Sequence, residues 1–198
     1  MRHATRYFLY HALFLIYCQP CATIPVYMIA ILHNIRSAHN VGSMFRTADA
    51  AGLERLYLCG ITPTPVKPEG HGAAGSNDML GSARKAFEKT ALGAEKSVPW
   101  EKCARTADCI RKLKAVGYFV CAVELAPDAV PYHEADFLKK NTDKLAFVVG
   151  HETDGLPKAL LHKCDAIIRI PMYGKKESLN VAVAFGIIAF EIARNTIR

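Results

Sequence analysis

Ile170-Pro171-Met172-Tyr173-Gly174 is followed, after three charged residues, by Ser178-Leu179-Asn180-Val181-Ala182-Val183-Ala184. The order predicts a strand end, a glycine turn and an apolar helix that Ser178 can cap. Backbone groups at the start of such a helix have no partners within it, and the small polar side chains of Ser178 and Asn180 lie at the same point. This combination suits a small polar ligand, so we expect a binding site here.

The segment 170–184 is called the third motif here, because two earlier segments are expected to contribute to the same site. The first motif is 40–42 with 46–48, at the start of an expected helix, and the second is 148–152 with 155–156, at the end of an expected strand. Gly150 directly follows apolar residues, where a glycine lets a ligand approach the backbone, although an ordinary strand-to-loop turn explains it as well. Glu152 then places a carboxylate at the strand end, either to orient a ligand or as a solvated loop charge.

Arg46 lies beside a small apolar helix face. An arginine in this setting is often a reader of phosphate or carboxylate groups, and a surface ion pair is the alternative. Asn40, near the start of the same helix, is expected to lie with Arg46 at the mouth of the site. His151 is interpreted as a neighbour of the site and not as a catalyst.

Short apolar runs alternate with helical patterns from Met28 onward. This alternation predicts an α/β fold with a mainly parallel sheet flanked by helices, in which ligands bind beyond the carboxyl ends of the strands. Gly150 and the turn at 170–174 both lie at such ends. The expected strands are 28–33, 55–59, 118–123, 145–149 and 166–170, and the expected helices are 38–52, 82–92, 104–116, 157–163 and 178–195. A proline- and glycine-rich loop over 62–75 is long enough to act as a lid.

A chain of 198 residues is most simply one domain, and 51% apolar residues can fill its core. The net charge of +7 is compatible with a polyanionic partner such as nucleic acid, but equally with none. The seven cysteines include one C-x-x-C, Cys18 and Cys21, without a second pair at zinc spacing. We therefore expect no metal site, and free buried thiols in a reducing compartment.

Residues 1–27 begin with basic residues and continue with an apolar run, as in a short signal peptide with Ala22 near a cleavage point. The run is too short for a membrane span of about 20 residues, and we expect no membrane partner. Because the strand-like run opens with a methionine, Met28 is expected to be the working start. Residues 1–27 are thus a predicted leader or extension, and 28–198 a single domain.

Taken in order, the three motifs resemble the SpoU (TrmH-like) family of RNA ribose 2′-O-methyltransferases in the SPOUT superfamily. Phosphate-loop, dinucleotide-binding and hydrolase-elbow motifs are missing from the sequence, which weakens competing interpretations. The positions that carry the resemblance are Asn40, Gly42, Arg46, Thr47, Ala48, Gly52, Val149, Gly150, Glu152, Gly155, Leu156, Ile170, Pro171, Met172, Gly174, Ser178, Leu179, Asn180, Val181 and Ala184.

The resemblance implies a SPOUT fold with a C-terminal trefoil knot, S-adenosylmethionine as the methyl donor, and a homodimer. It implies that Arg46 lies at the target ribose, often reaching it from the partner subunit, and that Asn40, Glu152, Ser178 and Asn180 are the other catalytic-site positions. The cofactor-binding positions that it implies are Val149, Gly150, Ile170, Met172, Ser178 and Leu179. One departure is Ala182, where the family often has a second serine.

The expected function is therefore methylation of a ribose 2′-hydroxyl in tRNA or rRNA, in the cytoplasm, without a metal. Two alternatives stay open. One is a catalytically silent RNA-binding relative that acts in ribosome or tRNA maturation. The other is a small-molecule enzyme on a doubly wound fold, which would use its positive charge for a phosphorylated metabolite.

Overall fold

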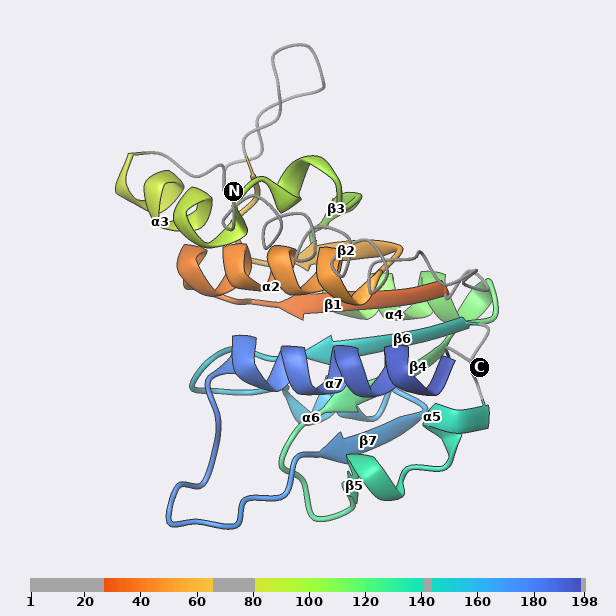
Figure 1. Ribbon diagram of the computed structural model, residues 1–198. Helices are drawn as coiled ribbons and strands as arrows, with labels where there is room; N and C mark the ends of the chain where they lie inside the picture. Colours follow the sequence, from red (N-terminus) through yellow and green to blue (C-terminus); the bar gives the residue numbers. More distant parts are fainter. Residues whose placement is uncertain (1–26, 66–80, 141–143, 197–198) are drawn as a thin grey trace, which may run out of the picture.

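The computed structural model describes residues 27–65, 81–140 and 144–196. Within these residues, seven strands form one sheet in the order β3-β2-β1-β6-β4-β7-β5, and every neighbouring pair is parallel (Figure 1). The mainly parallel α/β sheet expected from the sequence is therefore confirmed. The strands are β1 Tyr27–His33, β2 Arg55–Cys59, β3 Trp100–Cys103, β4 Phe119–Val123, β5 Val130–Pro131, β6 Lys144–Val149 and β7 Ala166–Arg169.

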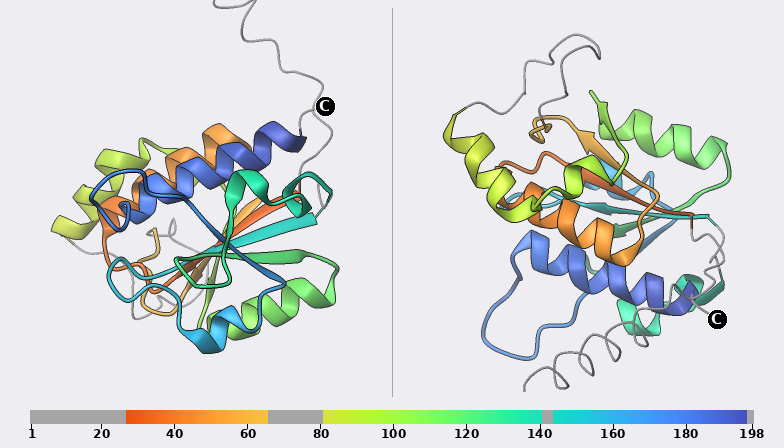
Figure 2. Two further views of the ribbon diagram at one scale, coloured as in Figure 1. Left: turned by 90° about the horizontal axis from the view of Figure 1, so that it is seen from below. Right: turned by 45° about the horizontal axis from the view of Figure 1, so that its top comes forward.

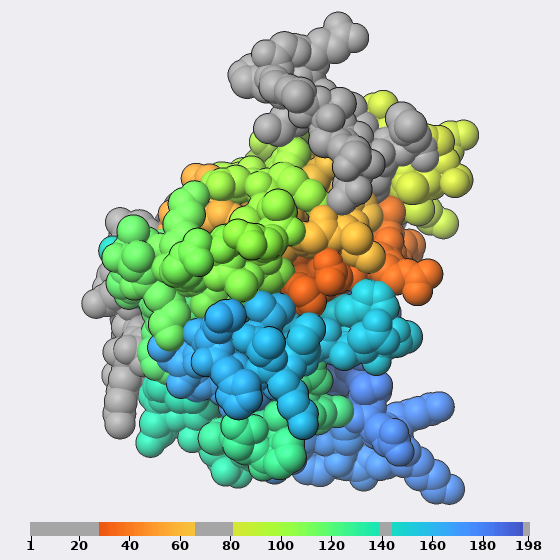
Figure 3. All heavy atoms as spheres, turned by 180° about the vertical axis from the view of Figure 1, so that it is seen from behind, coloured from red at the N-terminus to blue at the C-terminus, as the bar shows by residue number. Residues whose placement is uncertain are grey.

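Helices cover both faces of the sheet. Helices α2 and α7 lie side by side on one face, and α4 and α6 lie on the other (Figure 2). Figure 3 shows the second face, on which α4 and α6 lie. The amino group of Lys114 in α4 pairs with Asp165 after α6 at 2.6 Å. The helices are α2 Ala38–Ala51, α3 Ser82–Ala91, α4 Thr106–Ala115, α5 Phe137–Lys140, α6 Lys158–Leu161 and α7 Val181–Thr196, with short 3-10 turns at Ala94–Lys96 and Tyr132–Glu134.

The central strands are apolar on both faces because both faces are covered. In β1, Met28, Ala30 and Leu32 point into the core beneath α2 and α7, while Ile29 and Ile31 point into the core beneath α4. All five side chains are buried. Continuous apolar runs of this kind are what a parallel strand buried on two faces requires.

Gly42 lets α2 and α3 cross closely. A Cβ atom at this position would collide with Thr90 Oγ1 and lie 2.5 Å from the Phe87 carbonyl oxygen. The Thr90 hydroxyl donates to the His39 carbonyl at 3.0 Å, and Phe45 packs edge-on against Phe87 with ring centroids 5.4 Å apart. This glycine of the first motif is thus a helix-packing residue.

Most element predictions are confirmed to within two residues, but some were wrong or missing. The short edge strands β3 and β5 and helix α5 were not predicted from the sequence. The predicted start of the last helix was Ser178, whereas α7 begins at Val181. The reason is a different capping residue, described below.

Two predicted segments lie largely outside the described residues. Of the expected lid at 62–75, residues 62–65 are described, and Thr62 is buried, donating to the Leu32 carbonyl and accepting from Ile35 N. Strand β1 begins at Tyr27, one residue earlier than predicted, and residues 1–26 of the expected leader fall outside the description. Among the helices that are described, none is both long enough and apolar enough to span a bilayer.

Candidate active site

The Glu152 carboxylate joins the ends of two neighbouring strands. Strands β1 and β6 pair in parallel, so the residues after them emerge at the same sheet edge. Glu152 Oε2 accepts from the backbone N–H of Arg36 at 3.0 Å, and Oε1 accepts from Ser37 N at 2.9 Å. Oε1 also accepts from Asn40 Nδ2 at 3.2 Å, which links the second motif to the first.

Asn40 also forms a hydrogen bond with the third motif. Its Oδ1 atom accepts from Asn180 Nδ2 at 3.3 Å. Asn180 Oδ1 in turn accepts from Ala182 N at 2.8 Å, and the Asn180 carbonyl accepts from the next two backbone N–H groups of α7. A continuous polar network therefore runs from Glu152 to the start of α7 and brings the three motifs together.

The network controls the charge of Glu152. Burial alone would raise the pKa of this carboxyl group. The hydrogen bonds from the backbone of Arg36, Ser37 and Glu152 and from the Asn40 side chain outweigh burial and lower the pKa below its ordinary value. Glu152 is thus held ionised, as a fixed acceptor between two strand ends.

Asn180 is the N-cap of α7, not Ser178 as predicted. Its side chain accepts from the N–H two residues later, which is the normal N-cap bond. Ser178 lies two residues before this cap, and its residue is exposed. Ala182, which replaces the family's second serine, supplies the capped N–H and packs against the core.

A cavity of about 310 Å³ lies beside this network. Its walls come from the residues after β4 and β6, and from the segment between β7 and α7, which extends from the body of the molecule (Figure 1). Glu152 and Ala184 also line the cavity. All six residues that the resemblance implied for cofactor binding line it as well: Val149, Gly150, Ile170, Met172, Ser178 and Leu179.

Gly150 fits the second of the two explanations offered by its sequence position, an ordinary strand-to-loop turn. A Cβ atom here would lie 2.5 Å from the Gly155 carbonyl carbon and 2.8 Å from Leu156 N. The close neighbour is therefore the returning backbone of the same loop, which also pairs His151 with Gly155. Gly150 is required by this narrow loop, and the loop forms one wall of the cavity.

Glu124 is a cavity residue that the sequence analysis missed. It directly follows β4, and its Oε2 atom accepts from Leu156 N at 2.6 Å, while Oε1 accepts from Leu125 N at 2.9 Å. Like Glu152, Glu124 is a carboxylate that follows the carboxyl end of a parallel strand, and this position could have marked it as a candidate site residue. The apolar run before Glu124 is followed by no glycine motif that would mark it.

Arg46 lies apart from the arrangement expected within one chain, whereas His151 lies where it was expected. Arg46 is exposed on α2 and does not line the cavity, so the structure does not bring it to the other predicted catalytic residues within one chain. His151 lines the cavity, but its Nδ1 atom accepts from the N–H groups of Thr153 and Asp154, at 3.3 and 3.2 Å. His151 therefore shapes the loop, as a neighbour of the site.

Comparison with known proteins finds relatives of one kind. Among solved structures, the chain resembles a TrmH/SpoU tRNA modifying enzyme from A. aeolicus, with 30% identity and a TM-score of 0.67 over 85% of this chain and 74% of that one. It also resembles an AdoMet-bound rRNA methyltransferase from Sinorhizobium meliloti, with 30% identity and a TM-score of 0.68 over 85% of this chain and 56% of that one.

A curated relative is the 23S rRNA (guanosine-2′-O-)-methyltransferase RlmB of Neisseria meningitidis, which is 28% identical over 170 residues. The match covers 86% of this chain but 59% of the relative, so the chain spans about three fifths of that protein's length. The family model described as the SpoU rRNA Methylase family matches residues 27–190, from the first strand into the last helix. On this match the chain belongs to the SpoU rRNA methylase family.

Proposed function

We propose that this protein transfers a methyl group from S-adenosylmethionine to a ribose 2′-hydroxyl of tRNA or rRNA. The observation that carries the proposal is the network from Glu152 through Asn40 to Asn180, which fixes the three family motifs around one cavity. The relatives named above are RNA-modifying enzymes, and one of them was solved with AdoMet bound.

The cavity fits the proposed cofactor in size and chemistry. Its volume of about 310 Å³ lies within the usual range of small-ligand sites. Apolar side chains of Val149, Ile170 and Leu179 offer contacts to the adenine base and to the methylene groups next to the sulfonium. The carboxylates of Glu124 and Glu177 line the same space and favour a ligand that carries positive charge.

The sulfonium of the cofactor supplies an activated methyl group, so the chain's own task is alignment and charge stabilisation. Arg46 stays protonated, because a guanidinium does not lose its proton in proteins. We therefore assign it to holding the RNA phosphate next to the target ribose and stabilising the developing oxyanion. The hydroxyl proton passes to phosphate or water.

A homodimer explains how Arg46 reaches the site. The residue is exposed and away from the cavity of its own chain, and Val183 and Phe190 leave apolar side chains exposed on α7 at 51% each. Helices α2 and α7 lie side by side on one face of the sheet, so Arg46, Val183 and Phe190 all belong to the same helical layer. Pairing of two such layers would cover the apolar side chains and bring Arg46 of the partner subunit to the cavity.

The basic character of the chain supports RNA as the partner. Arg36, which meets Glu152 through its backbone, is exposed, and Lys175 and Lys176 are exposed in the segment before α7. These cations lie on segments that border the cavity and are suited to phosphate contacts. RNA binding should therefore weaken steeply with salt, and the 2′-hydroxyl requirement selects RNA over DNA.

We also propose the family's trefoil knot, formed by the segments around the cavity, and a single domain over residues 28–198. One sheet containing all described strands supports the single domain. The described cysteines are free thiols, which supports the reducing environment of the cytoplasm.

The decisive experiment compares wild type with Arg46→Lys. RNA from a strain that lacks the gene is incubated with S-adenosylmethionine, and ribose methylation is mapped by nucleoside mass spectrometry. The variant keeps the charge but loses the planar fork, so we expect methyl transfer to fall about 100-fold or more. Calorimetry should give a nearly unchanged cofactor affinity.

Three outcomes would contradict the proposal. Full activity of Arg46→Lys would remove the assigned role of the arginine. RNA binding without cofactor binding would indicate the catalytically silent relative. A methylated small molecule in place of 2′-O-methylated RNA would indicate the metabolite enzyme.

A further inference from the structure

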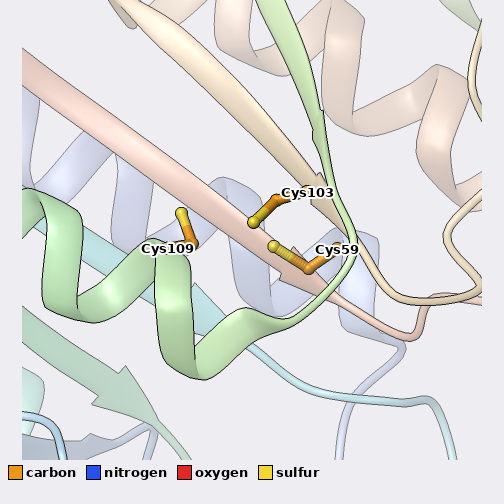
Figure 4. A group of neighbouring side chains, drawn as sticks. All are labelled: Cys59, Cys103 and Cys109. Carbon is orange, nitrogen blue, oxygen red and sulfur yellow. The ribbon is translucent and has the colours of Figure 1, made fainter.

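Three cysteines far from the cavity converge on one point. Cys59, Cys103 and Cys109 place their sulfur atoms within 4.8 Å of one another (Figure 4). Cys59 and Cys109 are buried, and Cys103 is half-buried. None of the three lines the cavity of the candidate active site.

The sheet explains why these sulfur atoms meet. Cys59 ends β2 and Cys103 ends β3, and the two residues are direct partners in the parallel register. Cys59 packs in the core on the α4 side of the sheet, with Cys103 against it, and Cys109 enters the same core from α4. Figure 4 shows the three side chains coming from two strands and one helix.

We propose that Cys59, Cys103 and Cys109 form a binding site for one thiophilic metal ion of the Zn²⁺ type. Metal–sulfur bonds of about 2.3 Å place three sulfur ligands about 4 Å apart, so the observed separation needs only a small contraction. Soft thiolates select such ions over Mg²⁺ or Ca²⁺.

Lys102, the residue before Cys103, brings a positive charge to the cluster. The Lys102 amino group is held beside the cluster by the carbonyl oxygens of Gly60 and Thr62, at 2.6 and 2.8 Å. Each thiol gives its proton to solvent as its metal–sulfur bond forms, so binding needs no oxidant.

Three ligands distinguish this site from a redox pair. A disulfide would join two of the sulfur atoms and leave the third without a role. A metal ion uses all three and ties β3, which pairs only with β2 among the described strands, to helix α4. Half-buried Cys103 gives the ion a route inward. The inference does not depend on the proposed methyl transfer.

Cd²⁺ is the probe for this site, because its bonds to thiolates give a charge-transfer absorption at longer wavelength than those of Zn²⁺, where it is easier to separate from the absorption of the protein. The full chain is reduced, freed of metal and titrated with Cd²⁺, and then with Zn²⁺ in competition. We expect one ion per chain, proton release on binding, and a higher melting temperature of the complex. Failure of the reduced chain to show the thiolate absorption would overturn the proposal.

Variants assign the ligands. Cys103→Ser is the main test because half-buried Cys103 tolerates the change best, and Cys109→Ala is the second. We expect at least about 100-fold weaker Cd²⁺ binding in each, since losing a ligand costs more than losing a residue that only hydrogen-bonds to a ligand. Cys164→Ser is the matched control, a half-buried free thiol outside the cluster, and should bind as wild type.

A Cys18→Ser/Cys21→Ser double variant separates the cluster from the C-x-x-C pair. It should retain one Cd²⁺ per chain. Loss of binding in this variant, or undiminished binding in Cys103→Ser, would assign the metal elsewhere. A Cys59–Cys103 disulfide found by mass spectrometry in the untreated native protein, without bound metal, would replace the metal site with a redox pair.

Discussion

Asn40 is placed so that both ends of its amide are used. It donates to Glu152 and accepts from Asn180, at 3.2 and 3.3 Å. An aspartate cannot donate at neutral pH, and an aliphatic side chain can do neither. The sequence analysis placed Asn40 at the site, but these two partners lie 112 and 140 residues away and could not be read from local patterns.

Asn40→Asp should loosen the link between the three motifs. The new carboxylate faces Glu152 at hydrogen-bond distance, so a donated bond is replaced by repulsion. We expect unfolding in urea to show a loss of about 1–3 kcal/mol, with weaker cofactor binding by calorimetry. His39→Asp adds the same charge at the neighbouring exposed position and is the control. Equal losses in both variants would mean that charge alone is responsible.

Glu152 should make the stability of the protein depend on pH in the acid range. Its folded-state pKa lies below the ordinary value of 4.5, so its contribution to stability is complete above about pH 4.5 and is lost as the pH falls through the folded-state value. At neutral pH, Glu152→Gln should lower the free energy of unfolding by about 1 kcal/mol. This is at the lower end of the range for hydrogen bonds to charged groups, because the carboxylate is partly exposed. Urea unfolding of both proteins should show the difference shrinking below about pH 4.5. A constant difference across that range would contradict the assigned ionisation. Glu177 is an exposed carboxylate on the cavity rim and serves as the control. Glu177→Gln should change neither the free energy of unfolding at neutral pH nor its dependence on pH.

At the scale of elements, local signals predicted α2 well and α7 less well. Ser37 accepts from Asn40 N at the start of α2, and Gly52 ends it in the left-handed conformation at φ 71°, as its sequence suggests. Before α7, Ser178 and Asn180 are both good capping residues. The contact with Asn40 selects Asn180, and that contact comes from the tertiary fold.

The two capping candidates can be separated by mutation. Asn180→Ala removes the bond to Ala182 N and the contact with Asn40, and we expect the free energy of unfolding to fall by about 1–2 kcal/mol. Ser178→Ala leaves the cap intact and should change stability by less than about 0.5 kcal/mol. Thermal unfolding followed by circular dichroism measures both. A larger effect at Ser178 would restore the capping role predicted from the sequence.

At the scale of the whole molecule, the sequence predicted the parallel sheet and the edge at which the site lies. It missed β3 and β5 because short edge strands carry no continuous apolar run: all four residues of β3 are only half-buried. The cysteine cluster was not predicted either, because its geometry depends on the pairing of β3 with β2. Glu124 required knowledge that β4 lies next to β6. The cysteine cluster and Glu124 both depend on strand order, which local periodicity does not specify.

Arg46 on α2 does not line the cavity of its own chain, and the proposed homodimer makes a direct prediction from this. We consider two inactive variants: Arg46→Ala, with an intact cavity, and Leu179→Arg, which puts a cation into the wall of a cavity proposed for a cationic ligand. A mixed dimer contains one intact cavity, which is served by Arg46 of the partner subunit. It should therefore recover about half of the wild-type methyl transfer, because one of two symmetric sites is rebuilt.

The measurement uses two differently tagged chains, co-expressed and purified through both tags, and assayed for RNA methylation. Paired Arg46→Ala chains carrying the same two tags are the control and should stay inactive, because no subunit supplies the guanidinium. If the mixed dimer is as inactive as this control, Arg46 must act on the cavity of its own chain. The segment between β7 and α7 or helix α2 would then have to move by the whole separation between Arg46 and the cavity, which the packing of α2 on α3 and α7 opposes.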